Sequence, residues 1–306
     1  MDYTNRTTTK YLNIDTRINN NEDCPFAEYT IRLPEKIHNV KSLSIVNIEL
    51  PITFFNISAC MNNNFFKVTR FNAFDNIRNR ENECTIIILP DDNYTVSSLV
   101  STLEILLRIN ILTKDLLVKS SPTNTIEFFS NRSQYTLDFA IDLLGNDDNR
   151  FFKSKFGWLL GFRFPCYTIK SNTGIVAETI CDLTMPRYLY LSIEDCNDTK
   201  NAFFSSLFSS YHNKNIIARI ALDNNTVQYG SVLPANLSNG FLVSDIRKFE
   251  YPIELRKLKI KVLNEFGCAI SLNGFEISFL MNIEQEICRS VTDVLDQSSQ
   301  NFYIIQ

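Results

Sequence analysis

The chain has 306 residues, a formal net charge of −4 and a hydrophobic fraction of 44%. This length and apolar content are ample for a globular core, and length alone predicts one large β domain or two smaller domains. The acidic balance argues against nucleic-acid binding. Only 2 histidines and 8 glycines occur, which leaves little material for histidine-centred metal sites or glycine-rich phosphate loops.

The cysteines are scattered and form no CxxC pair, so a zinc site is not expected. The first ten residues are polar, so we expect no secretory signal and therefore free, buried thiols in a reducing compartment. No apolar run approaches the length of a transmembrane span. The eight cysteines are Cys24, Cys60, Cys84, Cys166, Cys181, Cys196, Cys268 and Cys288.

Residues 1–23 are polar and predict an extended N-terminal arm that Tyr11, Leu12 and Ile14 could anchor. Apolar residues alternate with polar ones over residues 29–33, which is typical of a half-buried strand. Residues 41–50 carry apolar side chains at both odd and even positions, which point to opposite faces of a strand, so this strand is expected to be covered on both faces. The prolines at 34 and 51 are expected to break the segment.

The middle of the chain predicts one helix among short strands. Leucines and valines recur at helical spacing from Val96 to Arg108, with a cap near Thr95 or Ser97. The run KFGWLLGFRF at 155–164, which contains Trp158, predicts a short helix or tight turn buried against a sheet. Residues 198–214 are polar and predict a loop. Strands are expected at 84–89, 126–128, 135–141, 167–169, 175–179, 187–194 and 216–222.

The clearest alternation comes late in the chain. Apolar residues alternate with lysines over 257–262, and with Glu, Ser and Asn over 275–284. Turn signals lie between these two strands at 264–267 and 273–274. If the strands are neighbours, their opposite charges would contribute about a few tenths of a kcal/mol for each pair. From residue 287 onward the chain is expected to form a C-terminal arm.

These elements predict a mainly β fold, a single antiparallel jelly-roll sandwich with extended N- and C-terminal arms. The expected organisation is an N-terminal arm over 1–23, a jelly-roll domain over 24–286 and a C-terminal arm over 287–306. The domain is expected to carry an insertion with a helix over about 96–108 and a loop-rich region over 145–214. The βαβ rhythm of a parallel sheet is absent.

No residue pattern indicates catalysis, a cofactor or a metal ion. A Cys–His pair lacks supporting context, because His38 is expected in a polar turn. The acidic pairs at 91–92 and 147–148 are typical of solvated caps, and 146–149 lacks the ligand spacing of a calcium loop. The basic stripe at 256, 257, 259 and 261 fits a solvated strand face better than an anionic partner. The GFRF run at 161–164 favours core packing over a nucleic-acid platform.

One family shows a similar order of segments. The series YLNIDTR, YTIRLPEKIHNVKSLSIVNIELP, NNNFF, LPDDNYTVSSLVSTL, FGWLLGFR, YLYLSIEDCN, IIARIAL and FEYPIELRKLKIKVLNEFGCAISLNGFEISFLMNIE resembles capsid proteins of nucleocytoplasmic large DNA viruses. It is most similar to their single jelly-roll penton and minor capsid proteins. The resemblance covers residues 11–286.

The resemblance implies a virion structural protein without enzymatic activity or cofactor. A penton would form homopentamers at fivefold vertices and contact the major capsid protein and minor capsid proteins, without nucleic acid. Contact with an inner membrane would be indirect at most, and assembly is expected in the host cytoplasm. The alternative within this class is a minor capsid (cement) protein. The residues we expect to contact neighbouring subunits are Tyr11, Leu12, Ile14, Arg17, Phe302 and Tyr303.

A function from a different class stays open at this point. Jelly rolls also host lectin sites, so a carbohydrate-binding module is an alternative in which Tyr188 and Tyr190 would be exposed aromatic contacts. An enzyme has no support beyond chance residue pairs.

Overall fold

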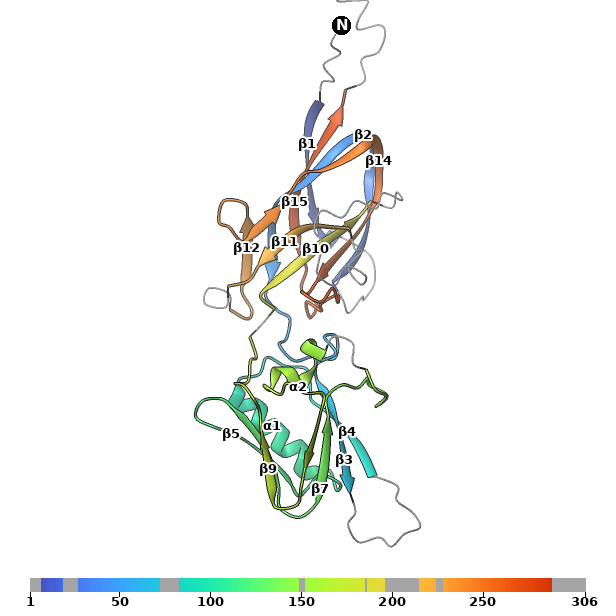
Figure 1. Ribbon diagram of the computed structural model, residues 1–306. Helices are drawn as coiled ribbons and strands as arrows, with labels where there is room; N and C mark the ends of the chain where they lie inside the picture. The colour runs from blue at the N-terminus through green and yellow to red at the C-terminus, as the bar shows by residue number, and fades with distance from the viewer. Residues whose placement is uncertain are drawn as a thin grey trace, which may run out of the picture.

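The computed structural model describes residues 7–18, 27–71, 83–148, 152–184, 186–195, 215–223 and 228–287. Figure 1 shows two lobes, one above the other, joined by two stretches of chain. The upper lobe holds the strands from the two ends of the chain. The lower lobe is formed by the segment between β2 and β10. Each lobe has its own cluster of buried apolar residues.

The upper lobe is an antiparallel sheet of eight strands that curls around its core. Its order is β1-β15-β2-β14-β10-β11-β13, and β12 also pairs with β2. The strands are β1 (Thr7–Asp15), β2 (Glu28–Pro51), β10 (Tyr188–Glu194), β11 (Ile216–Ala221), β12 (Val232–Asn236), β13 (Leu242–Ser244), β14 (Arg247–Leu263) and β15 (Ser278–Glu286). This mainly β, antiparallel, curled arrangement confirms the predicted fold class, a jelly-roll sandwich.

Strand β2 belongs to both layers of this sandwich. Its first half pairs with β14, and its second half pairs with β15 on one side and with β12 on the other. The backbone of Asn39, with φ of 55°, takes the left-handed conformation that asparagine tolerates better than most residues. It lies beside Val40, where the pairing with β15 begins. The strand therefore changes partners at this position.

Pro34 was expected to break this segment, and that expectation is wrong. The strand continues through Pro34 and ends at Pro51, as expected for the second proline. Pro34 lies between the pairs Arg32–Lys257 and Ile37–Leu255, where the register with β14 shifts. A proline lacks the N–H of a regular ladder, and an irregular stretch of this kind can accommodate it.

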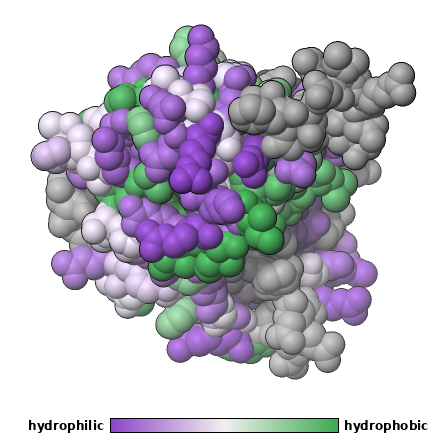
Figure 2. Space-filling model, turned by 90° about the horizontal axis from the view of Figure 1, so that it is seen from below, coloured by the Kyte–Doolittle hydropathy of each residue, from purple (hydrophilic) through white to green (hydrophobic). Residues whose placement is uncertain are grey.

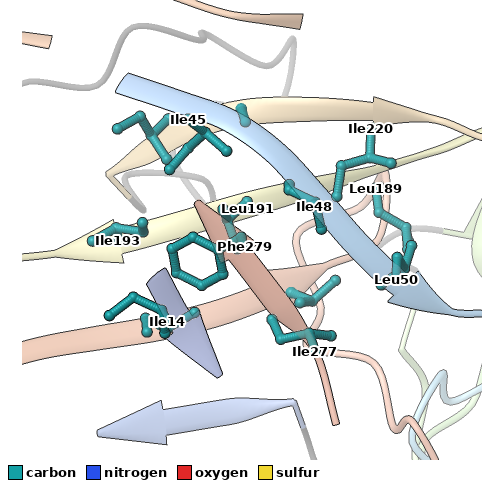
Figure 3. Packing of buried hydrophobic residues seen from close by; sticks show 14 of the residues in the cluster. Ile14, Ile45, Ile48, Leu50, Leu189, Leu191, Ile193, Ile220, Ile277 and Phe279 are labelled. Atoms are coloured by element: carbon teal, nitrogen blue, oxygen red, sulfur yellow. The ribbon is translucent and has the colours of Figure 1, made fainter. Parts of the chain in front are cut away.

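The core of the upper lobe is formed by apolar residues that alternate with polar ones in the sequence. Figure 3 shows Ile45, Ile48 and Leu50 of β2 packed toward Leu189 and Leu191 of β10, with Phe279 of β15 nearby. Removing apolar side chains from water in this way is the main favourable term in folding. Leu189, Leu191 and Ile193 all face this core, as their alternation predicted.

The lower lobe contains two small sheets and the helix α1. One sheet has the order β4-β3-β7-β8 and the other β5-β6-β9. The strands are β3 (Phe65–Phe71), β4 (Glu83–Ile88), β5 (Leu116–Ser120), β6 (Ile126–Ser130), β7 (Gln134–Asp138), β8 (Cys166–Ile169) and β9 (Thr173–Val176). The helices are η1 (Thr16–Ile18, which follows β1), η2 (Phe152–Ser154), α1 (Val96–Ile109) and α2 (Phe156–Leu159).

The predicted helix is confirmed at its first residue and extends one residue beyond the predicted end. Thr95 caps it, since its side chain accepts a hydrogen bond from the backbone N–H of Ser98, while the Ser98 hydroxyl accepts one from the backbone N–H of Thr95. This reciprocal arrangement satisfies donors that the first turn leaves open. Leu99, Leu103 and Leu107 are buried on the face toward the sheets.

Aromatic side chains fill the core of the lower lobe. Phe66 of β3 contacts Phe128, Phe139 and Phe156 at ring-centroid distances of 6.1, 5.6 and 5.5 Å. Phe162 adds stacking against Phe139 at 5.3 Å. The FGWLLGFR run therefore supplies core residues, as favoured from its sequence. Trp158 itself lies at the edge of this core, covered by the Arg163 guanidinium at 4.1 Å from the ring centroid.

Gly161 shows why this run contains a glycine. Its φ is +97°, and a Cβ at this position would lie 2.2 Å from the carbonyl oxygen of Thr179. Any side chain would therefore collide with the backbone in addition to straining the left-handed conformation. The close approach allows Gly161 O to accept a hydrogen bond from Thr179 N at 3.2 Å.

The N-terminal segment lies in the body rather than in an arm. Strand β1 pairs antiparallel with β15 along its whole length, from Thr7 opposite Glu286 to Asp15 opposite Ser278. The expectation of an arm over 1–23 is therefore wrong for residues 7–18. The predicted C-terminal arm, residues 287–306, and the predicted loop 198–214 lie outside the described residues, apart from residue 287.

The two late strands are separated in space by a third. β2 lies between β14 and β15, so the lysines of 257–261 do not face the acidic residues of β15. The charges pair with β2 instead: Lys261 lies 3.1 Å from Glu28, and Glu286 lies 3.4 Å from Lys41. Both predicted turns are present, with φ of 78° at Gly267, 53° at Asn273 and 80° at Gly274.

Candidate functional site

The described residues provide little material for catalysis. No group of three or more His, Cys, Asp or Glu side chains among them could hold a metal ion. His38 lies in β2 rather than in the polar turn that was expected, with Nδ1 3.1 Å from Glu254 Oε1 on the neighbouring β14. Glu254 also forms an ion pair with Lys36. This exposed cluster is typical of cross-strand pairing on a solvated sheet face.

Two of the described cysteine thiols, Cys166 and Cys181, are poorly suited to nucleophilic chemistry, which requires the thiolate. Burial raises the pKa of the Cys181 thiol to about 12, and partial desolvation raises the pKa of Cys166, although this residue is exposed. The expectation of buried thiols is correct for Cys181 and wrong for Cys84, Cys166 and Cys268, which are exposed. Cys24, Cys196 and Cys288 lie outside the described residues.

One acid of each pair contacts another part of the chain, whereas solvated caps were expected. The Asp91 carboxylate accepts hydrogen bonds from Ala59 N at 2.8 Å and from Asn64 Nδ2 at 3.2 Å. The Asp148 carboxylate lies 3.1 Å from Nζ of Lys155, a lysine that is only 3% exposed. Lys155 also donates to the carbonyl of Ile141 at 3.0 Å. Both acids are therefore engaged in structure.

One cavity lined by both polar and aromatic side chains lies where the two lobes meet. It is a cleft of about 530 Å³ whose lining includes Trp158, Tyr188, Tyr190, Arg187 and Glu265. Glu265 comes from the turn after β14, and its carboxylate accepts a hydrogen bond from Arg187 N at 3.1 Å. Burial raises the pKa of this carboxyl above its ordinary value. Glu265 therefore ties the jelly-roll lobe to the chain that leads out of the lower lobe.

Asn56 forms the other half of this junction. Its side-chain amide donates to the carbonyls of Tyr94 and Leu183 at 2.8 and 3.1 Å, and its amide oxygen accepts from Tyr94 N at 2.9 Å. Asn63 continues the network, since it donates to Asn56 O at 2.9 Å and accepts from Ser58 N at 2.8 Å. The NNNFF and FFNIS segments thus join the two connections between the lobes. Nothing in their composition distinguished this role from an ordinary loop.

The aromatic residues of the cleft do not form an open sugar platform. Tyr190 is 8% exposed, so the expectation that it is an exposed contact is wrong. Its ring lies 5.3 Å from that of Tyr188, and the Arg219 guanidinium lies 4.2 Å from the Tyr188 ring centroid. Arg163 and Lys153 both lie close to the Trp158 ring. These contacts occupy ring surface that a sugar would need for stacking.

The predicted contact residues lie on and beside β1. Tyr11 is 61% exposed and Leu12 is half-buried, while Ile14 is 4% exposed and packs into its own core. Arg17 is exposed and pairs with Asp15 through two hydrogen bonds, from Nε at 2.9 Å and from Nη2 at 2.5 Å. This pairing lowers the pKa of the Asp15 carboxyl. Phe302 and Tyr303 lie outside the described residues. As contacts between subunits, all six residues stay predictions.

Figure 2 shows the end of the molecule formed by the lower lobe, where apolar atoms form a band between hydrophilic ones. The lower lobe contributes several exposed apolar side chains, including Ile105 and Ile109 one turn apart on α1. A surface of this kind is common at protein contacts. No described helix is both long enough and apolar enough to cross a membrane.

Comparisons with known proteins give a likeness among solved structures alone. No family model and no curated protein matches the chain. Among solved structures, the chain is similar to a selenomethionine-labelled mavirus penton protein, with 12% sequence identity and a TM-score of 0.36. This alignment covers 92% of the present chain and 100% of the other. The likeness is one of general outline, and the function proposed below is argued from other observations.

Proposed function

We propose that this protein is a structural component of a viral capsid, and that it is a penton base protein at the fivefold vertices of an icosahedral large DNA virus. Of the ordered sequence segments that resemble capsid proteins, the first two and the last three map onto strands of an antiparallel jelly roll, the fold which that resemblance implied, and the other three lie in the lower lobe. The proposed partners are further copies of the chain in a pentamer, the major capsid protein and minor capsid proteins.

The observation that carries this proposal is the arrangement of the sheet edge. Strand β1 ends the sheet and pairs with β15 so that Thr7 lies opposite Glu286. The first residue of β1 and the last residue of β15 therefore lie side by side, at the top of Figure 1. Subunits form a ring through head-to-tail contacts, in which one surface of each subunit binds a different surface of the next subunit. The edge of β1, the last described strand of its sheet, can supply such a contact.

A virion map tests the proposal directly. We expect density that fits this two-lobed shape at each fivefold vertex, with five copies related by the vertex axis. Density elsewhere in the shell, together with a higher copy number for each virion, would instead identify the chain as a minor capsid (cement) protein. Absence of the protein from purified virions would contradict both assignments.

A further inference from the structure

The end of the lower lobe that lies away from the upper lobe is held together by hydrogen bonds between its turns. Strand β3 runs toward this end, and β7 begins there beside it (Figure 1). Asn131 N, in the turn after β6, donates to Asp115 O in the connection after α1 at 3.2 Å. Ser171 Oγ, in the turn after β8, donates to Arg132 O at 2.6 Å. These bonds gather three stretches of chain on one surface, which we call the outer end: residues 108–115, 131–133 and 170–172.

The outer end carries basic side chains that face solvent. Arg108, Lys114, Arg132 and Lys170 are all exposed. In the part of the chain that the structure describes, none of these four side chains forms an ion pair. Their charges are therefore available to an anionic partner.

Acidic residues at this end are fewer. Asp115 accepts a hydrogen bond from the Ser133 hydroxyl at 3.5 Å, Glu83 lies opposite Arg70 in the pairing of β3 with β4, and Glu104 is one turn before the end of α1. Most acids of the lower lobe lie toward the upper lobe instead, because β7 runs in that direction and ends at Asp138. The acids at that end are Asp91, Asp92, Asp138, Asp142, Asp147, Asp148, Glu178 and Asp182. The lower lobe is thus polarised, with its positive end outward.

Aliphatic side chains are exposed beside these cations. Ile109, the last residue of α1, is 74% exposed, and Ile111 is 77% exposed. Figure 2 looks onto this end and shows apolar atoms in a band between hydrophilic ones. Exposed aliphatic surface with a polar rim is found where proteins contact other proteins or membranes.

A bilayer that contains anionic phospholipids offers a partner for both kinds of side chain. Its headgroups attract lysine and arginine. Its acyl boundary lies about 5–10 Å deep, within reach of aliphatic side chains on the same surface. A nucleic acid matches the cations alone, because the protein side chains that bind its phosphates are polar or basic. The isoleucines therefore favour the bilayer.

We propose that the outer end of the lower lobe binds the surface of an anionic lipid bilayer, with Ile109 and Ile111 inserted below the headgroups and the four exposed basic side chains on lipid phosphates. This contact is direct, whereas the sequence predicted indirect membrane contact at most. It does not depend on the capsid role, and it uses the opposite end of the molecule from the edge of β1 (Figure 1).

Flotation of the purified full-length chain with lipid vesicles tests the contact. One set of vesicles consists of phosphatidylcholine alone, and the other contains phosphatidylcholine and phosphatidylserine in equal parts. We expect the chain to float with the second set only. Raising the salt concentration from about 0.1 M to about 1 M shortens the Debye length from about 10 Å to about 3 Å and should weaken this binding.

A charge variant and its matched control locate the basic part of the surface. The charge variant is Lys114→Gln with Lys170→Gln, and the control is Lys248→Gln with Lys257→Gln, at two exposed positions of β14 in the upper lobe. Each basic residue near an anionic surface contributes roughly fivefold in affinity, so the charge variant should bind roughly twentyfold more weakly. The control should bind as the unmodified chain does.

An apolar variant and its control test the isoleucines. The apolar variant is Ile109→Ser with Ile111→Ser. Its control is Leu144→Ser with Ile180→Ser, at positions that are 84% and 59% exposed at the other end of the lobe. We expect the apolar variant to bind anionic vesicles at least roughly tenfold more weakly and the control to bind unchanged.

Fluorescence separates insertion from a purely electrostatic contact. Ile111→Trp places an indole at the outer end, and lipids brominated in their acyl chains quench an indole that reaches them. We expect quenching of Ile111→Trp on anionic vesicles. Ile180→Trp is the matched control and should show only the signal of the unmodified chain, which comes from Trp158.

Several results would overturn the inference. Absence of flotation with anionic vesicles would do so and would leave the capsid role intact, because the virion map tests that role separately. Flotation that both the charge variant and the apolar variant retain would place the membrane contact elsewhere on the chain. Binding of double-stranded DNA that the charge variant loses, without binding of vesicles, would assign the outer end to a nucleic acid.

Discussion

The two lobes are built from the chain in opposite ways. The lower lobe is one continuous segment, from β3 to β9, and the buried residues of its core all come from the stretch between Ile57 and Cys181. The upper lobe combines strands from both ends of the chain, and residues as far apart as Ser42 and Glu284, 242 positions along the sequence, share a hydrogen bond. The lower lobe can complete its core before the upper lobe has all its strands.

Because of this difference, we expect a substitution in one lobe to lower the free energy of unfolding of that lobe alone. Phe66→Ala removes a fully buried ring from the lower lobe and should lower the free energy of unfolding of that lobe by about 3–5 kcal/mol. Phe279→Ala is the matched change in the upper lobe, where Phe279 is also fully buried. Native-state hydrogen exchange measures each effect, because it reports opening free energies by region. Equal loss of protection in both lobes from either variant would show a single cooperative unit.

Arg247 allows the stability of the upper lobe to be changed by itself, because all the contacts of this buried charge named below lie in that lobe. It is 2% exposed and donates to the carbonyls of Ile193 and Asn215 at 2.9 and 2.7 Å. Arg247→Met keeps much of the volume but leaves these carbonyls without the donor and removes the charge that interacts with Asp195. We expect a loss of about 3 kcal/mol, measured by urea denaturation, with hydrogen exchange in the lower lobe unchanged. Arg256→Met, at an exposed position of the same strand, is the control.

The cap of α1 provides a smaller effect confined to the lower lobe. Thr95→Ala removes the acceptor for Ser98 N and should cost about 1 kcal/mol. Thr95→Ser keeps the acceptor and is the matched control. Amide exchange in the first turn of α1 should accelerate in the alanine variant only. A change in exchange within β14 or β15 would contradict the separation of the lobes.

Glu265 is expected to give the smallest effect, and it acts where the lobes meet. Because burial raises the pKa of this carboxyl in the folded protein above its ordinary value of 4.5, the folded state binds more protons than the unfolded state between the two pKa values. Stability is therefore highest below the unfolded pKa and falls as pH rises through the folded pKa. Glu265→Gln should flatten this part of the stability–pH curve in urea titrations. A curve that keeps its slope in this variant would assign the dependence to another group.

Alternation of side chains was the most reliable guide from sequence to structure. It identified the core faces of β14 and β15, because each of these strands buries mainly one face. It also identified the aliphatic face of β10, although β10 is buried on both faces. The helical spacing of Leu99, Leu103 and Leu107 located α1, because this helix also buries one face. The strands β5, β12 and β13 were not predicted, although the similarly short β6, β8 and β9 were. In β5 the exposed Leu117 obscures the alternation of Leu116 and Val118, Pro234 argues against a strand in β12, and β13 has only 3 residues.

Partners distant in sequence could not be predicted. The lysines of β14 and the acids of β15 suggested a pair, yet β2 lies between them. The polar sequence of residues 7–10 suggested an arm because this part of β1 is exposed on both faces, which removes the alternation that marks a half-buried strand. The junction residues Asn56 and Glu265 carry no pattern, because their partners are backbone atoms of other segments.

The long strand β2 imposes an order on biosynthesis. It emerges early from the ribosome, but its partners β12, β14 and β15 all lie after the whole lower lobe. Its apolar residues and backbone groups lack these partner strands while the intervening chain is made. Sheets whose strands pair over long sequence distances fold slowly and expose aggregation-prone surface. The inserted lower lobe can fold during this delay. Its folding brings the rest of the chain back to the end of β2, where β12 and the start of β15 pair with it.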